Sequence, residues 1–193
     1  MTIRKLPKNA RLVPKNAKKV FTGEIFDIYQ WQQEMYDGSL SIFEMAKRTD
    51  TVQILGIVDG QLLVLNEEQP DGTKRAFGLP GGRIDPDDGS PLYASKREMK
   101  EETGYSFRNW KLLNVHQPQR KIEWFIYVYI AWDALDRVDQ KIDVGEKIEV
   151  ELLDWQDYLK KGNSYTITEN KLTNYKTVTD LIESKEFAEK ANG

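Results

Sequence analysis

Arg-Glu-Met-Lys-Glu-Glu-Thr-Gly, residues 97–104, contains three glutamates whose spacing is unusual. Glu98, Glu101 and Glu102 are related as i, i+3 and i+4, so on a helix they share one face. Helix energetics oppose this, because Glu98 and Glu102 are like charges one turn apart and all three lie in the C-terminal turns, where the helix dipole favours cations. A divalent cation would relieve both conflicts, and oxygen ligands suit Mg²⁺ or Mn²⁺. The alternative is a solvated acidic helix face.

A glycine-rich loop precedes this segment. Residues 78–91 read Gly-Leu-Pro-Gly-Gly-Arg-Ile-Asp-Pro-Asp-Asp-Gly-Ser-Pro, and the Gly81-Gly82 pair lets the backbone turn sharply and approach a ligand closely. Ser90 followed by Pro91 is typical of a helix N-cap and first helical residue. We therefore predict a loop followed by a helix over residues 91–103, with the carboxylates near the end of that helix.

Loop and helix together resemble the Nudix box, whose pattern is G-x5-E-x7-R-E-U-x-E-E-x-G-U, where U is a bulky apolar residue. Gly82 matches the first glycine, and residues 97–105 match the second half. The loop carries one residue more than the pattern, since Asp88 has the expected spacing from Gly82 and Gly89 has the expected spacing from Arg97. In the family this acidic residue mainly braces the arginine, and Asp88 can do so if the extra residue bulges out.

The resemblance implies a metal-dependent hydrolase. Its metal ligands would be Glu98, Glu101, Glu102 and the backbone carbonyl of Gly81, and its ion would be Mg²⁺, with Mn²⁺ as the alternative. Arg97 completes the catalytic set as the brace of a neighbouring carboxylate, either Glu101 or the acidic loop residue.

Residues 20–160 resemble one branch of the family, the ADP-ribose pyrophosphatases. Residues 42–48, Ile-Phe-Glu-Met-Ala-Lys-Arg, look like the second N-terminal strand of that branch, where an aromatic ring stacks on adenine and an arginine follows. The resemblance assigns Phe43 and Arg48 to substrate binding, with Phe26 as a second stacking ring. The alternative for Phe43 is an ordinary packing residue, because strands are rich in aromatics.

Two further segments match positions that act in catalysis or bind the diphosphate in this branch. Residues 145–150, Gly-Glu-Lys-Ile-Glu-Val, resemble a late loop whose first glutamate, here Glu146, contacts the catalytic water or a metal. Gln69 stands near the position where the branch usually has an arginine that holds the diphosphate. Arg75 or Lys74 would have to replace it.

Composition excludes several other classes of site. The chain has 193 residues with a net charge of −3, no cysteine and one histidine, which removes disulfides, thiolate chemistry and histidine-rich metal sites. No apolar run approaches the length of a membrane span, so we expect a cytoplasmic protein without membrane contact. Residues 1–19 carry seven Lys or Arg and no acid, and we expect a solvated tail or a strap across a neighbour. Because the rest is acidic, no nucleic-acid partner is expected.

Three regions follow from the order of the elements. Residues 1–19 form the basic arm, residues 20–48 form a strand-rich element, and residues 49–193 form the hydrolase domain with a C-terminal helix. The fold class is α+β, an α/β/α Nudix sandwich with a mixed sheet, preceded by a small antiparallel N-terminal sheet.

We expect a first strand pair over 20–36 and 39–48, joined by Asp37-Gly38 in a type I′ turn. A hairpin over 51–58 and 61–65 follows. The later elements are a central strand over 123–132, a strand over 147–154 and a helix over 175–189. The first pair is apolar on both faces, and a lone hairpin is marginally stable. It therefore needs a partner surface, which in the resembled branch belongs to a second copy in a homodimer.

The sequence favours hydrolysis of a nucleoside diphosphate linked to another group, most specifically ADP-ribose. Alternatives are another nucleotide-sugar or nucleoside triphosphate hydrolase, or a catalytically silent module that binds a nucleotide or protein. The retained glutamates oppose a silent module.

Overall fold

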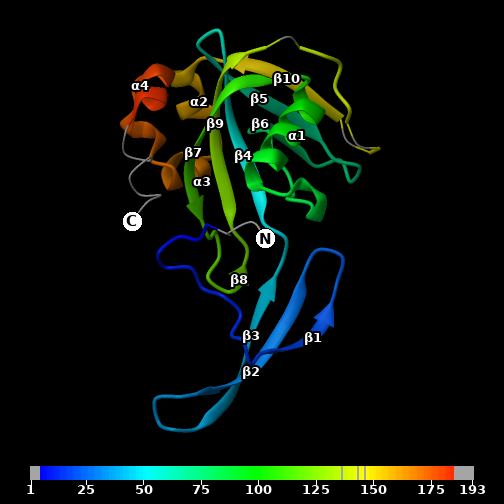
Figure 1. The fold of residues 1–193 in the computed structure, drawn as a ribbon, viewed down its shortest axis with the longest axis vertical. Coiled ribbons are helices and arrows are strands. Elements are labelled where there is room, and N and C mark those ends of the chain that lie inside the picture. Colours follow the sequence, from blue (N-terminus) through cyan, green and yellow to red (C-terminus); the bar gives the residue numbers. More distant parts are fainter. Residues whose placement is uncertain (1–4, 136, 143, 146, 185–193) are drawn as a thin grey trace.

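The computed structural model describes residues 5–135, 137–142, 144–145 and 147–184. Figure 1 shows a sheet with helices on both faces, and a smaller sheet that projects from one end of it. The predicted fold class is confirmed: an α/β/α sandwich with a mixed sheet follows a small N-terminal sheet.

The core sheet has six strands in the order β10-β5-β4-β9-β7, with β6 paired to β5. Strands β4 and β9 run parallel, whereas the other neighbours run antiparallel. Strand β9 lies between two others, as expected for the predicted central strand, but it starts three residues later than predicted. The strands are β4 (Thr51–Val58), β5 (Gln61–Glu68), β6 (Lys74–Gly78), β7 (Phe107–His116), β9 (Ile126–Ala134) and β10 (Lys147–Leu153).

Both faces of this sheet are covered by helices, because alternate strand residues are apolar on either side. On one face, Val52 and Ile54 pack with Met99 of helix α1 (Pro91–Thr103). On the other face, Leu55 and Ile57 pack against α2 (Trp155–Lys161), α3 (Ser164–Glu169) and α4 (Val178–Glu183). Two short 3₁₀ turns, η1 (Pro86–Asp88) and η2 (Leu172–Asn174), complete the layers.

The strands of the N-terminal sheet differ from their prediction in two ways. The strand expected over 20–36 is two strands, β1 (Lys18–Thr22) and β2 (Asp27–Glu34), because the chain turns where the Gly23 N–H donates to the Phe26 carbonyl at 3.0 Å. Strand β3 (Leu40–Lys47) pairs with β2 as predicted. A short strand from the core, β8 (Ile122–Glu123), joins β3 in parallel, so the sheet is not purely antiparallel.

Of the Asp-Gly pairs at 37–38 and 59–60, only the second has the type I′ signature. Asp59 and Gly60 between β4 and β5 have φ values of 49° and 79°, and this turn requires positive φ at both positions. Asp37 has no positive φ, and the loop closes instead where Met35 N–H donates to the Ser39 carbonyl at 2.7 Å. The predicted type I′ turn at Asp37-Gly38 is therefore wrong.

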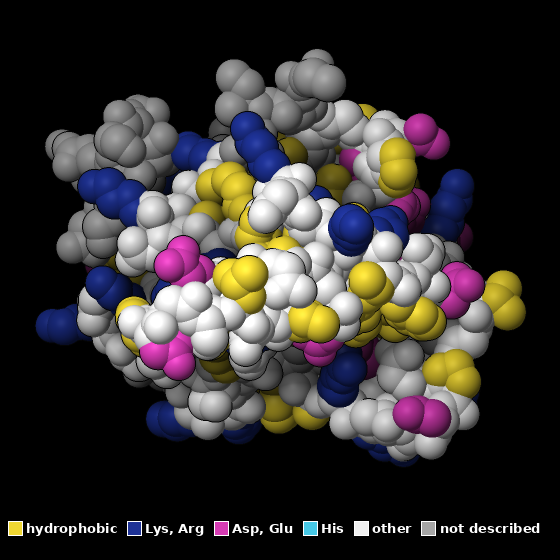
Figure 2. All heavy atoms as spheres, turned by 90° about the horizontal axis from the view of Figure 1, so that it is seen from below, with side chains coloured by type: hydrophobic (Ala, Val, Ile, Leu, Met, Phe, Trp, Pro, Cys, Tyr) yellow, Lys and Arg dark blue, Asp and Glu magenta, His cyan; other side chains and the backbone are white. Residues whose placement is uncertain are grey.

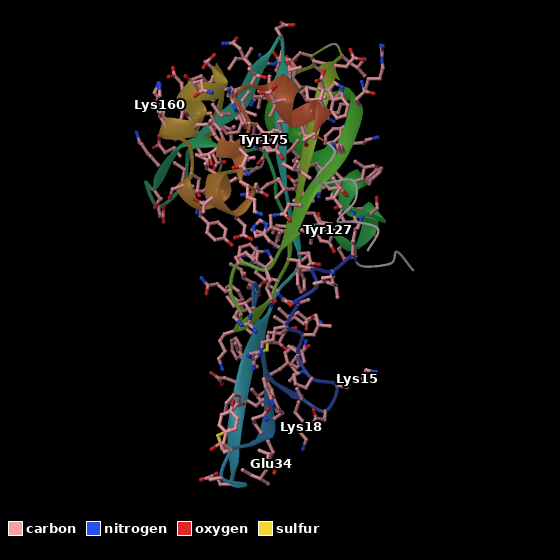
Figure 3. The ribbon with its side chains drawn as sticks, turned by 90° about the vertical axis from the view of Figure 1, so that its left-hand side faces the viewer. Lys15, Lys18, Glu34, Tyr127, Lys160 and Tyr175 are labelled. Atoms are coloured by element: carbon pink, nitrogen blue, oxygen red, sulfur yellow. The ribbon has the colours of Figure 1, made fainter. Side chains whose placement is uncertain are left out.

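The described part of the basic arm lies along its own chain. The Arg11 N–H donates to Gln117 at 2.8 Å, the Val13 N–H donates to Glu123 at 2.7 Å, and the Tyr127 hydroxyl donates to the Lys5 carbonyl at 3.0 Å. Figure 3 shows Lys15 and Lys18 beside the projecting sheet and Tyr127 in the core above it. The arm therefore straps the N-terminal sheet to the core.

At the C-terminus the expected helix over 175–189 is shorter within the described residues. Helix α4 spans Val178–Glu183, with Val178 and Leu181 buried, and residues 185–193 lie outside the described part. In that part of the chain, no helix combines the length and apolar character that a membrane span requires.

Candidate functional site: a carboxylate-bearing helix and its glycine loop

Helix α1 has the boundaries and caps that the sequence predicted. The Ser90 hydroxyl accepts from the Tyr93 N–H at 3.1 Å, Pro91 is the first helical residue, and Gly104 ends the helix with φ of 75°. The helix buries Met99 against β4. The helix that carries the glutamates is therefore capped at both ends, which fixes their backbone positions.

The glycine loop lies directly against these glutamates. The Gly81 N–H donates to the Glu102 carboxylate at 2.8 Å. A Cβ on Gly82 would lie 2.4 Å from a Glu98 carboxylate oxygen, and one on Gly81 would lie 2.1 Å from the Val52 carbonyl. Position 81 therefore needs glycine, since a side chain there would collide with the backbone of β4, whereas a side chain at position 82 would displace the Glu98 carboxylate.

The carbonyl of Gly81 is available as a ligand. The flanking carbonyls of Pro80 and Gly82 accept hydrogen bonds from Ile54 and Val52 of β4, at 2.8 Å and 2.9 Å. Within the described part of the chain, the Gly81 carbonyl accepts no hydrogen bond. It could therefore serve as the backbone ligand that the sequence predicted.

Arg97 links the loop to the helix. Its guanidinium donates to both oxygens of Asp88 at 2.8 Å and 2.9 Å, and one nitrogen donates to Glu98 and Glu101, each at 2.9 Å. These hydrogen bonds, first of all the one with Asp88, raise the pKa of Arg97 and lower that of Asp88. Gly89 takes up the extra residue with φ of 67°, so Asp88 reaches the arginine despite its shorter side chain.

Glu98 is a buried carboxylate with a shifted pKa. Its side chain is only 14% exposed, and burial raises its pKa to about 7 although Arg97 acts in the opposite direction. Buried carboxylates with raised pKa values concentrate at functional sites. A cation beside Glu98 would favour its charged form.

The three glutamates do not converge on one point in this structure. Glu98 and Glu101 turn toward Arg97, whereas Glu102 turns toward Gly81. Accordingly, the described residues contain no group of three His, Cys, Asp or Glu side chains arranged to hold a metal. The carboxylate and carbonyl oxygens are nevertheless the kind of ligand that a hard divalent cation prefers.

A hollow of about 340 Å³ opens beside this cluster. Arg97 and Glu101 form part of its wall, so it is continuous with the carboxylate site. Four basic and two acidic side chains make it suitable for an anionic group. Its lining residues are Tyr93, Lys96, Arg97, Lys100, Glu101, Val138, Asp139 and Lys141.

The predicted substrate-binding residues of the N-terminal region fall into two groups. Phe43 is half-buried, with its ring centroid 6.0 Å from that of Trp31 and the Lys121 ammonium 4.7 Å above it. Phe26 instead lies 5.6 Å from the guanidinium of Arg48. Among the described residues, Phe26 and Phe43 make no ring contact with each other, and their stacking on a base stays a prediction.

Arg48 has a second aromatic neighbour that the sequence did not single out. Trp124 lies 4.6 Å from its guanidinium, and the indole N–H of Trp124 donates to Thr51 at 3.0 Å. The Arg48 Nε is buried without a hydrogen-bond partner among the described residues. Burial, and then the nearby charge of Arg83, lower the pKa of Arg48. Trp124 lies between β8 and β9, at the start of an apolar run in the sequence, and this run conceals any functional signal.

The remaining predicted residues gather at the turn between β5 and β6. The Gln69 N–H donates to the Thr73 carbonyl at 2.9 Å, and Arg75 pairs across the strands with Glu67. A Cβ on Gly145 would lie 3.3 Å from Pro70, so this turn adjoins the loop after β9. Glu146, predicted to act on the catalytic water, lies outside the described residues.

Comparisons with known proteins agree with this geometry. The model of the NUDIX domain matches residues 47–170. An ADP-ribose pyrophosphatase of Bacillus subtilis (strain 168) is 24% identical over 158 residues, which is 80% of this chain and 84% of that protein. Diphosphoinositol polyphosphate phosphohydrolase 2 of Rattus norvegicus is 30% identical over 92 residues, 47% of this chain and 49% of that one. A solved ADP compounds hydrolase shares the fold, with a TM-score of 0.65 and 20% identity over 83% of this chain and 90% of that one.

Proposed function

Because the chain belongs to the Nudix family of hydrolases, we propose that it cleaves the diphosphate of a nucleoside diphosphate linked to another group. ADP-ribose is the substrate that we favour, with AMP and ribose 5-phosphate as products. The observation that carries this proposal is the packing of Glu98 and Glu102 against the Gly81-Gly82 loop.

Metal dependence follows from the chemistry of a diphosphate, whose anionic oxygens repel a nucleophile, so catalysis depends on neutralising charge and positioning. Nudix hydrolases generally use divalent metal ions. We propose Mg²⁺, with Mn²⁺ as the alternative, held by Glu98, Glu101, Glu102 and the Gly81 carbonyl. Such an ion supplies neutralisation of the diphosphate oxygens and a more acidic bound water.

The chain's own residues orient the metal ligands and take the proton of the attacking water. Arg97 keeps Glu98 and Glu101 oriented while Asp88 fixes the guanidinium from the other side. Glu146, or one of the helix glutamates, takes the proton of the attacking water. Attack in line with the leaving group at one phosphorus then separates the two halves of the substrate.

Substrate recognition is assigned to the N-terminal region. The B. subtilis relative is named for ADP-ribose and aligns with most of this chain. Phe43 offers a half-buried ring for a base, and Arg48 offers a guanidinium held between two rings. We propose that residues 20–48 also form a homodimer interface.

A second candidate is another nucleotide sugar or a nucleoside triphosphate. One observation favours it: Gln69 carries no charge and the nearby Lys74 lies 3.6 Å from Glu68, so Arg75 would have to hold a diphosphate here by itself. A catalytically silent module is the candidate from another class.

A substrate panel in Mg²⁺ tests these candidates together. Release of AMP is measured from ADP-ribose, and release of the corresponding monophosphates from other nucleotide sugars and triphosphates. We expect the highest kcat/KM for ADP-ribose and no turnover in EDTA. A higher kcat/KM for another compound would replace the substrate, and binding without turnover of any compound would support the silent module.

A further inference from the structure

The C-terminal end of α1 is closed by a segment that follows β9. The last carbonyls of a helix have no partners within the helix. Here four consecutive carbonyls accept hydrogen bonds from residues 137–141, more than thirty positions later in the chain. The bonds run from Lys141 N–H to Glu101 at 2.8 Å, from the Gln140 amide to Glu102, from Arg137 Nε to Thr103 at 3.1 Å, and from Val138 N–H to Gly104 at 3.0 Å.

Gln140 differs from the other donors because its side chain joins two elements. The amide nitrogen donates to the carbonyl of Glu102 and also lies 3.5 Å from the carbonyl of Ile148, at the start of β10. Glu102 is in turn the residue whose carboxylate accepts from Gly81 at 2.8 Å. One glutamate is therefore held at both ends, by Gln140 at its backbone and by the glycine loop at its side chain.

The hydrogen bonds from residues 137–141 also reduce an electrostatic repulsion at the end of α1. Glu101 and Glu102 place negative charge in the last turn of α1, where the exposed carbonyls are already negative. The amide of Gln140 and the guanidinium of Arg137 place donors at those carbonyls. They offset part of the repulsion that would otherwise fray this turn and displace the glutamates.

We propose that Gln140 is a positioning residue that fixes the backbone of Glu102 and thereby aims its carboxylate into the metal-binding position. The inference rests on the proposed metal-dependent function. Gln140 acts through Glu102 and touches neither substrate nor reacting atoms. Partners that orient metal ligands typically contribute about 10–100-fold to metal affinity or activity.

The test measures direct Mn²⁺ binding to the full chain by titration calorimetry, without substrate. Gln140→Leu removes the donor at similar size, and Gln140→Glu keeps the shape but faces the Glu102 carbonyl with oxygens. We expect Kd for Mn²⁺ to rise about 10–100-fold in Gln140→Leu and at least as much in Gln140→Glu. The matched control is Gln119→Leu, the same change at an exposed glutamine whose side chain makes no hydrogen bond among the described residues, and its Kd should equal that of the parent.

The outcomes separate positioning from a merely structural role. All proteins are compared at a temperature where each is folded, and Tm is measured alongside. A lower Tm with an unchanged Kd for Mn²⁺ would overturn the inference, as would a Gln140→Glu variant that binds like the parent or a parent that does not bind Mn²⁺. If Kd responds as expected while the parent leaves ADP-ribose intact, the proposed substrate fails and the positioning role stands.

Discussion

Arg97 is the residue that makes the acidic helix face tolerable without a metal. One guanidinium donates to Asp88, Glu98 and Glu101, and to the carbonyl of Arg83 at 3.0 Å. It therefore neutralises part of a cluster whose like charges would repel each other at one-turn spacing. None of these hydrogen bonds involves Glu102, so removing the charge of Glu102 leaves all of them in place.

This leads to a prediction for Glu102→Gln. We expect kcat to fall by roughly 10²–10⁴-fold in saturating Mg²⁺, as for the loss of a main electrostatic stabiliser. Without metal the variant should be no less stable than the parent, because Gln can still accept from Gly81 and one repulsive charge is gone. Steady-state kinetics and thermal melts in EDTA provide the two measurements. An unchanged kcat, or a large drop in Tm without metal, would contradict this account.

Phe43 tests substrate recognition at the same scale. If its ring stacks on a base, Phe43→Ala should raise KM by the equivalent of about 1–3 kcal/mol and leave kcat nearly unchanged. If it is only a packing residue, the variant should instead lose about 3–5 kcal/mol of stability with little change in KM. Kinetics and urea unfolding on one variant distinguish the two, with Tyr36→Ala, a fully exposed ring in the turn between β2 and β3, as control.

At the scale of elements, sequence patterns predicted what local chemistry determines. Helix α1 and the β4–β5 hairpin follow from a Ser-Pro start, a glycine C-cap and an Asp-Gly turn. Strand β7 and helices α2 and α3 were not predicted, because their apolar residues become buried only through contacts across the sheet. Strand β6 was not predicted because it is short and mostly exposed, so it carries no apolar pattern.

In the candidate site, too, the sequence predicts local contacts but not contacts between distant residues. The pairing of Asp88 with Arg97 could be expected from the spacing of the box, since both lie within one loop and helix. The contacts of Gln140 and Trp124 bring together residues 38 and 76 positions apart in the chain, namely Gln140 with Glu102 and Trp124 with Arg48. No local pattern encodes such pairs, so they became visible only in the fold.

The glycine loop allows an element-scale prediction. Gly81 has φ of 153°, and a Cβ there would lie 2.1 Å from the Val52 carbonyl, so Gly81→Ala adds both backbone strain and a collision with β4. We expect urea unfolding to show a loss of about 1–3 kcal/mol, as for overpacking. Gly72→Ala is the matched control, because Gly72 also has positive φ, 84°, but its Cβ would meet nothing within 4 Å. Equal losses in both variants would mean that strain alone, and not contact with β4, holds the loop.

For the whole molecule, the single histidine predicts how stability depends on pH. His116 is 5% exposed, neither ring nitrogen has a hydrogen-bond partner among the described residues, and burial lowers its pKa from 6.5 to about 4. Between these values the unfolded chain binds a proton that the native protein does not, so stability falls as pH drops from about 6.5 toward 4. The loss is on the order of 3 kcal/mol at 1.36 kcal/mol per pKa unit. Urea unfolding across this range should therefore show a steeper pH dependence for the parent than for His116→Phe, and identical slopes would refute it.

The N-terminal sheet predicts the assembly of the whole molecule. The register places Phe21, Leu40 and Ile42 on one face, and they are 59%, 66% and 66% exposed, whereas Trp31 and Met45 on the other face are buried. Figure 2, which looks at this end of the molecule, shows a band of apolar side chains with charged ones around it. Exposed apolar patches of this kind mark interaction surfaces.

We expect this face to pair with a second copy of the chain, because a small sheet with one open apolar face gains stability from a partner. Sedimentation at micromolar concentration should then give about twice the chain mass of 22.4 kDa. Ile42→Glu places a charge in the middle of the face and should shift the protein toward the monomer. Leu135→Glu alters an exposed apolar residue outside this sheet, 44% exposed, and should leave the dimer intact. If the parent sediments as a monomer and still hydrolyses ADP-ribose at its full rate, neither the interface nor a contribution of the partner to the active site can be retained.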